Sequence, residues 1–289
     1  MTHTIGTPAA RPYFSAAQAC WNQRETLAQL KPRILAFARA AEDPTSLNLY
    51  QHAQLTAAAL EFRPDLILEL GRGYGNSTCD FTEVANLLGT TRVLSLDQYN
   101  NWNRTAGRLR GFVQRSWFHR LQALETNILT FNFKEVLAGS RRVLLFWDAH
   151  GFEIAKVVLS RIMPELADRE HLVIMHDIGD LRHQGPETLS YGDNELWTGG
   201  SNTSRFLKIG FLDSNVEQAI AILDFSTRNR FPLYTADHSL ATELTAAQSA
   251  ELARLWGDMF SCYGQWLYFS LREAAGALTF PKLSTAVTS

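Results

Sequence analysis

The spacing of hydrophobic residues changes near residue 64, from a helical pattern to a strand-like one. Before this point, apolar residues recur at the spacing of one helix face, as Ala17, Cys20 and Trp21 do. After it, short and nearly continuous apolar runs alternate with amphipathic stretches. Runs of this kind are typical of strands that are buried on both faces of a parallel sheet. They predict strands at 66–70, 92–97, 143–147 and 172–175.

The stretches between these runs fit helices, and the alternation predicts a doubly wound, mostly parallel α/β sheet of the Rossmann-like kind. We expect helices at 77–88, 112–124, 154–166, 216–225 and 245–259, with further strands at 231–235 and 265–271. The segment 179–210 is rich in Gly, Asp, Asn and Ser. It predicts a long loop over the edge of the sheet, and loops of this length are usually either functional or disordered.

The N-terminal part predicts several short helices. Pro32 predicts a break between two of them, and Thr45 or Ser46 predicts the start of a third, because both residue types are good N-caps. We interpret residues 1–62 as a loose tail followed by a helical cap, and residues 63–289 as the α/β domain. Any homo-oligomer is expected to form through the N-terminal helices.

The composition is that of an ordinary globular chain. Of 289 residues, 46% are hydrophobic and 19% are charged, which argues against a disordered protein. The formal net charge of -2 predicts no nucleic-acid partner. No apolar run approaches the roughly 20 residues of a membrane span, and residues 1–6 lack the pattern of a secretory signal. The three cysteines lie far apart and favour a reducing, cytoplasmic location.

The most informative stretch is ELGRGYGNS, which runs from Glu69 to Ser77. Gly71, Gly73 and Gly75 alternate directly after a buried strand and before a helix. Glycine allows a sharp backbone turn and a close approach to a ligand, and the first turn of the helix directs free N–H groups to the same place. Open α/β sheets bind ligands at this end of their strands. The stretch therefore predicts a cradle for a small molecule.

The residues around these glycines indicate the kind of ligand. The dinucleotide fingerprint is G-x-G-x-x-G, but Asn76 occupies the position of its third glycine. Glu69 precedes the glycines, where an acid suits an ammonium group better than a pyrophosphate. Asp97 ends the next strand, and an ionised carboxylate can accept hydrogen bonds from two ribose hydroxyls. Together these features describe S-adenosylmethionine (SAM).

An acid, then G-x-G-x-G, then an acid at the end of the next strand resembles the pattern of the class I SAM-dependent methyltransferases. The resemblance covers about residues 50–180 and implies their seven-stranded fold. It implies that the glycine loop holds the methionine part of SAM and that Asp97 holds the ribose. Asn127 stands where many relatives carry an acid for the adenine amino group. The implied cofactor-binding residues are Glu69, Gly71, Gly73, Tyr74, Gly75, Ser77, Asp97, Asn127 and Asp148.

Acids and histidines follow two further strands. Asp148 and His150 come directly after the strand at 143–147, and His176 and Asp177 follow the one at 172–175. Because these strands neighbour the first one in the doubly wound order, all four side chains are expected to face the glycine cradle. Two acids and two histidines at one rim can bind a divalent metal or move a proton, and their spacing does not decide between these roles.

These pairs resemble those of a bacterial O-methyltransferase subfamily that acts on natural products, sugars and cell-surface polymers. Relatives hold magnesium with acids at these strand ends, which implies Mg²⁺ or Mn²⁺ on Asp148, His176 and Asp177. His176 replaces the aspartate of those relatives. His150 or His176 is the alternative, a general base, because an imidazole titrates near pH ~6.5.

The sequence as a whole predicts O-methylation of a small-molecule, sugar or natural-product hydroxyl, with the 180–210 loop closing over the acceptor. Two other classes stay open: a nicotinamide-dependent oxidoreductase, and a protein that binds SAM without catalysis. A metal-dependent oxygenase built on Asp148, His150 and His176 is a more remote third class.

Overall fold

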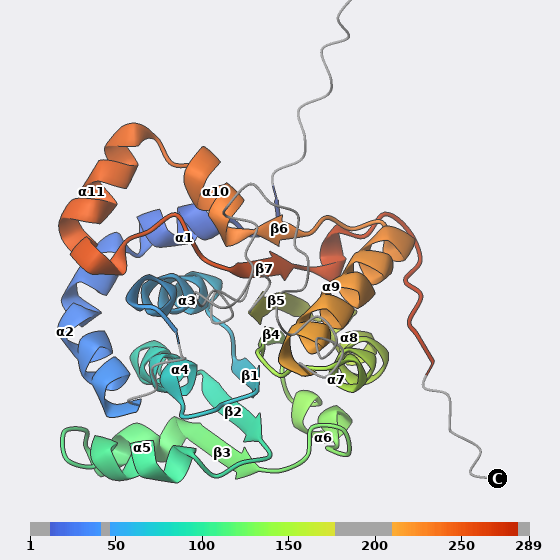
Figure 1. Ribbon diagram of the computed structural model, residues 1–289, viewed down its shortest axis with the longest axis horizontal. Coiled ribbons are helices and arrows are strands. Elements are labelled where there is room, and N and C mark those ends of the chain that lie inside the picture. The colour runs from blue at the N-terminus through green and yellow to red at the C-terminus, as the bar shows by residue number, and fades with distance from the viewer. Residues whose placement is uncertain (1–11, 42–46, 177–209, 283–289) are drawn as a thin grey trace, which may run out of the picture.

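A seven-stranded sheet forms the centre of the computed structural model, which describes residues 12–41, 47–176 and 210–282 (Figure 1). The strand order is β3-β2-β1-β4-β5-β7-β6. Strands β1 to β5 are parallel, and β7 runs antiparallel to both of its neighbours. This confirms the predicted doubly wound, mostly parallel sheet. The strands are β1 (Leu66–Leu70), β2 (Arg92–Asp97), β3 (Leu121–Glu125), β4 (Arg142–Trp147), β5 (Glu170–His176), β6 (Tyr234–Thr235) and β7 (Trp266–Phe269).

The middle strands are apolar on both faces because helices cover both. All five residues of β1 are buried, and its register places Leu66 beside Arg92 of β2 and beside Val143 of β4. Alternate residues of each strand enter different cores. Ile67 belongs to the cluster that packs against α1 to α4, and Leu68 to the cluster that packs against α6 to α9.

The helices form a layer on each side of the sheet (Figure 1). One layer contains α1 (Ala16–Asn22), α2 (Arg24–Ala41), α3 (Leu49–Phe62) and α4 (Asn76–Leu88), with α10 (Ala236–Thr242) and α11 (Ala246–Trp256) next to α1 and α2. The other layer contains α6 (Phe133–Leu137), α7 (Phe152–Val157), α8 (Met163–Leu166) and α9 (Gly210–Asn229). A π-helical turn at Val158–Ile162 joins α7 to α8. Short 3₁₀ turns lie at Arg115–Arg120, Gly257–Met259 and Leu271–Glu273.

The prediction of a helix at 112–124 is wrong. The chain forms α5 (Trp102–Leu109) earlier, and the predicted stretch contains a 3₁₀ turn followed by β3. Leu121 pairs with Val93 of β2, so the end of the stretch completes the sheet. β3 is an edge strand with no fully buried residue, and its few apolar residues fit a helical spacing as well as a strand.

The starts and ends of the N-terminal helices also differ from the prediction. Pro32 lies inside α2, whose buried stripe continues from Leu27 to Phe37, so packing outweighs the hydrogen bond that proline cannot make. α3 begins after Asn48, which forms a capping box with Gln51. The expected N-caps at 45 and 46 lie outside the described residues, as does the predicted 179–210 loop apart from its last residue. The short helix α10 was not predicted.

No helix in the described ranges is both long enough and apolar enough to cross a membrane.

The burial of His171 in β5 predicts a stability that depends on pH. Its ring is fully buried, Nδ1 lies 3.0 Å from the Arg169 carbonyl oxygen, and Nε2 accepts a hydrogen bond from the Leu271 N–H at 2.8 Å. Burial is the main cause that lowers the pKa of His171 from 6.5 to about 4. The unfolded chain therefore binds a proton as the pH falls below 6.5, whereas the folded chain does not until about pH 4.

We expect stability to fall between these two pH values, and His171→Gln, which takes up no proton, to reduce the loss. The wild type should lose about 2 kcal/mol more than the variant between pH 7 and pH 5. Urea unfolding of both proteins at the two pH values measures the difference. Equal losses would show that the neutral ring of His171 does not contribute.

Candidate functional site

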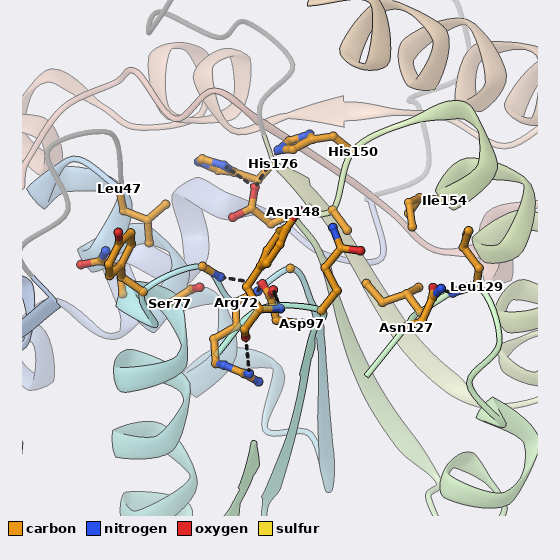
Figure 2. Close-up of a pocket in the computed structure, with 18 of the residues that line it drawn as sticks. Leu47, Arg72, Ser77, Asp97, Asn127, Leu129, Asp148, His150, Ile154 and His176 are labelled. Atoms are coloured by element: carbon orange, nitrogen blue, oxygen red, sulfur yellow. Dashed lines mark hydrogen bonds and ion pairs between the residues drawn. The ribbon is translucent and has the colours of Figure 1, made fainter. Parts of the chain in front are cut away.

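A cavity of about 490 Å³ lies at the carboxyl ends of β1, β2, β4 and β5. Its wall includes most of the residues that the sequence singled out: Gly71, Gly73, Tyr74, Ser77, Asp97, Asn127, Asp148, His150 and His176. In Figure 2, Asp148 lies near the centre, with His150 and His176 above it and Asp97 below. Asn127 and Leu129 lie on one side of this group, and Leu47 and Ser77 on the other. Asp177 lies outside the described residues.

The three glycines of the loop after β1 meet three different requirements. Gly71 has φ +86°, and a Cβ there would lie 2.3 Å from the carbonyl oxygen of Asp148. Gly75 has φ +92°, and its Cβ would lie 2.3 Å from the ring of Trp102. Gly73 has φ +51° but faces open space, with nothing within 4 Å of a Cβ. Two glycines therefore allow the loop to fit between its neighbours, and the third leaves room on the cavity wall.

Glu69 lies behind the loop and is fully buried. Its two oxygens accept hydrogen bonds from the hydroxyls of Ser77 and Thr78, each at 2.6 Å. Burial raises the pKa of Glu69, and these hydroxyls act in the opposite direction. Glu69 and Gly75 are both absent from the set of described residues that line the cavity. Glu69 thus ties β1 to the first turn of α4, whose N-cap is Gly75.

Asp97 holds the glycine loop from the side of β2. Its Oδ2 accepts hydrogen bonds from the backbone N–H groups of Arg72 and Gly73 at 2.8 and 2.9 Å, and its Oδ1 accepts one from Tyr99 at 2.7 Å. A carboxylate accepts about four hydrogen bonds, so it retains acceptor capacity for a ligand. Asp97 lines the cavity and is 8% exposed. It is therefore placed both to shape the loop and to bind a hydroxyl group.

The sequence did not predict the role of Arg72, whose guanidinium points away from the opening. Its nitrogen atoms donate to the carbonyl oxygens of Ser95, Leu124 and Tyr99. The residue is 5% exposed, and its positively charged guanidinium is hydrogen-bonded to carbonyl oxygens of β2 and β3. Three acids also line the cavity, namely Asp97, Asp148 and Glu153.

Asp148 joins both predicted histidines. Its Oδ1 lies 3.2 Å from Nδ1 of His176 and 4.0 Å from Nε2 of His150. His176 is 8% exposed, whereas the side chains of His150 and Asp148 are about one quarter exposed. The structure thus brings together three of the four residues in the second predicted group.

The predicted metal site depends on a residue outside the described part of the chain, Asp177. Within that part, no group of three or more His, Cys, Asp or Glu side chains is arranged to hold an ion. Asp148 is the acid that faces the two histidines, and its Oδ1 is already in contact with His176. The described residues on their own do not fit a magnesium site, which requires several oxygen ligands.

An apolar wall forms the side of the cavity beyond Asn127. Ile128, Leu129 and Ile154 contribute to it, and Asn127 Oδ1 accepts a hydrogen bond from the Leu129 N–H at 2.9 Å. The sequence did not reveal Ile128 and Leu129, because β3 was interpreted as part of a helix and the loop after it could not be placed. Ile154 begins the helix predicted at 154–166, but its place on the cavity wall was not predicted. Leu47, next to α3, was also missed.

No family model matches the chain, and no curated protein matches it. Solved structures resemble it at low identity. An SAH-bound methyltransferase from Podospora anserina is 12% identical, with a TM-score of 0.45 over 78% of this chain and 85% of that one. An O-methyltransferase from Bacillus cereus in complex with SAH is also 12% identical, with a TM-score of 0.40 over 74% and 82%. A Staphylococcus aureus protein provisionally described as a caffeoyl-CoA O-methyltransferase is 13% identical, with a TM-score of 0.44 over 74% and 93%. At this identity and with TM-scores below 0.5, the resemblance assigns no role to this chain.

We expect alanine at two of the loop glycines to have different effects on stability. Gly71→Ala forces a methyl group against the Asp148 carbonyl and should cost about 3 kcal/mol. Gly73→Ala meets open space and should cost about 1 kcal/mol, the strain of a left-handed backbone. Chemical unfolding of both variants measures the two losses. Equal losses would contradict the account of the loop.

Proposed function

We propose that this chain is a SAM-dependent methyltransferase that methylates a hydroxyl oxygen of a small molecule. The observation that carries the proposal is the junction between Asp97 and the glycine loop, in which two backbone N–H groups of the loop donate to one carboxylate oxygen. When bound, SAM supplies a methyl group on a sulfonium that is already an activated donor.

The cavity wall offers a contact for each part of SAM. The acceptor capacity left on Asp97 suits the ribose hydroxyls. The apolar wall of Ile128 and Leu129, with the amide of Asn127, suits the adenine. The backbone of Gly71 to Tyr74 suits the methionine part, because glycine allows a close approach.

The charge of the cavity favours SAM over a dinucleotide. Asp97, Asp148 and Glu153 place three carboxylates on the wall, and the guanidinium of Arg72, which also lines the cavity, is hydrogen-bonded to carbonyl oxygens of β2 and β3. Carboxylates attract the sulfonium and ammonium of SAM and repel a pyrophosphate. Gly71 lies against the Asp148 carbonyl, so Asp148 is next to the loop that would hold the methionine part of SAM. It is therefore a better candidate than Asp97 to attract the cationic groups of SAM. Glu69 supports the site from behind by holding the first turn of α4.

The acceptor hydroxyl has to lose its proton as its oxygen attacks the methyl group. His150 is the favoured base because it lies on the cavity wall and is partly exposed. Asp148 Oδ1 lies 4.0 Å from Nε2 of His150, so a carboxylate stands beside the ring that would accept the proton. His176 is less suited, since both of its ring nitrogens face protein groups.

Asp177 and nearly all of the 179–210 segment lie outside the described residues. They follow β5 directly in the chain, and we assign to them the binding of the acceptor. Comparing turnover in the presence of EDTA, Mg²⁺ and Mn²⁺ tests whether a metal assists.

Homo-oligomerisation through the N-terminal helices would involve α1 and α2, because nearly all of α3 is buried within the chain.

Calorimetric titration tests the cofactor assignment. We expect SAM and S-adenosylhomocysteine (SAH) to bind at one site, and both NAD⁺ and NADH to give no signal. Asp97→Ala should weaken SAH binding roughly 10- to 100-fold, as expected for loss of hydrogen bonds to a charged group. The matched control is Asp168→Ala, at an exposed position next to the start of β5 and at the opposite end of the strands. Unchanged affinity in Asp97→Ala would refute the ribose assignment, and nicotinamide binding would favour the oxidoreductase.

Kinetics tests the base once an acceptor has been identified. His150→Asn should lower kcat by about 10²- to 10⁴-fold, the usual contribution of a general base, and leave SAH affinity unchanged. His119→Asn, at an exposed position in the turn before β3, is the control and should retain full turnover. Normal turnover in His150→Asn would assign proton removal to another group.

A further inference from the structure

The side-chain amide of Gln51, in the first turn of α3, has its orientation set by two backbone groups of opposite polarity. Its Oε1 accepts a hydrogen bond from the Asn48 N–H at 2.8 Å. Its Nε2 donates to the carbonyl oxygen of Gly264 at 2.9 Å. A backbone N–H cannot accept and a carbonyl cannot donate, so the reversed amide would lose both bonds. The residue is 2% exposed, and water cannot easily replace them.

This orientation determines which nitrogen of His176 carries the proton. Nε2 of Gln51 lies 3.0 Å from Nε2 of His176. Because the amide nitrogen is a donor, the ring nitrogen that faces it has to be the acceptor and therefore bears no proton. The proton of the neutral ring then resides on Nδ1, which faces Asp148 Oδ1 at 3.2 Å. The ring thus accepts from α3 on one side and donates to the cavity wall on the other.

We propose that Gln51 is a positioning residue of the site: it holds His176 in the neutral, Nδ1-protonated tautomer, so that His176 orients the Asp148 carboxylate. Through these contacts, a residue of the N-terminal helices determines the orientation of the Asp148 carboxylate, which faces His150. His176 then acts as a donor to Asp148 rather than as the base or a metal ligand. The tautomer stands on geometry alone, whereas its consequence for proton removal by His150 rests on the proposed function.

The helix offers a matched control one turn further along. Gln54 also holds the loop before β7, since its Nε2 donates to the carbonyl oxygens of Ser261 and Tyr263 at 2.9 and 3.0 Å. Its Oε1 accepts from Nε1 of Trp266, so both ends of this amide are held by groups other than His176. Glutamate at either position places a carboxylate against backbone carbonyls, so both variants lose comparable loop contacts. Only the change at position 51 alters the partner of the His176 ring.

Nitrogen NMR of the full chain with ¹⁵N-labelled histidine provides the test. Long-range ¹H–¹⁵N correlations at neutral pH report which ring nitrogens are protonated, and the His176 signals are assigned by their loss in His176→Gln. We expect the wild type to show a protonated Nδ1 and a bare Nε2. Gln51→Glu replaces the donor with an acceptor, so Nε2 of His176 should gain a proton. Gln54→Glu should retain the wild-type pattern.

A wild-type spectrum with the proton on Nε2 overturns the proposal, and this result does not depend on whether either variant folds. A folded Gln51→Glu protein whose His176 keeps a bare Nε2 overturns it as well. Protonation of His176 Nε2 in Gln54→Glu would also overturn it, because that variant leaves the partner of the ring unaltered. Titration of SAH into the same wild-type sample separates this inference from the proposed function. The expected tautomer without SAH binding would leave Gln51 as a positioning residue and refute only the cofactor assignment.

Discussion

The site depends on one electrostatic constraint: a buried carboxylate at the end of β2 receives the backbone N–H groups of the loop at the end of β1. Asp97 accepts from Arg72 and Gly73 through a single oxygen, which fixes the left-handed turn between two strands that are already paired. Gly71 and Gly75 make the turn sterically feasible, because a side chain at either position would collide with the end of β4 or with α5. Asp97 therefore both fixes the shape of the loop and places a negative charge on the cavity wall.

The acids around this junction lie at different depths and serve different purposes. Glu69 is fully buried and bound by two hydroxyls, so it stabilises the start of α4. Asp97 bonds to the loop and still reaches the cavity. Asp148 is the most exposed of the three, and two histidines lie beside it. Sequence position alone does not separate these roles, since all three acids lie at or next to the carboxyl end of a buried strand.

The sequence predicted every strand except β3, and the polar residues at the strand ends that line the cavity, for a physical reason. Strands covered on both faces need continuous apolar runs, and the residues that follow parallel strands meet at one edge of the sheet. It could not predict β3, whose half-exposed residues fit a helix equally well. It also missed Gln51 and Arg72, because a polar side chain on a helix or in a loop gives no sign of the distant backbone groups that it bonds. The assignment of residues 1–62 to a separate cap stays a prediction, but Leu47 and Gln51 show that this part of the chain contributes to the site.

The central claim is that Asp97 and the glycine loop form the seat of a sulfonium nucleoside. A crystal structure of the chain with SAH bound tests it most directly. The account predicts ribose hydroxyls within hydrogen-bond distance of Asp97, adenine against Ile128 and Leu129, and the sulfur on the side of Asp148 and His150. An SAH molecule seated elsewhere, or a pyrophosphate bound at the glycine loop, would contradict it.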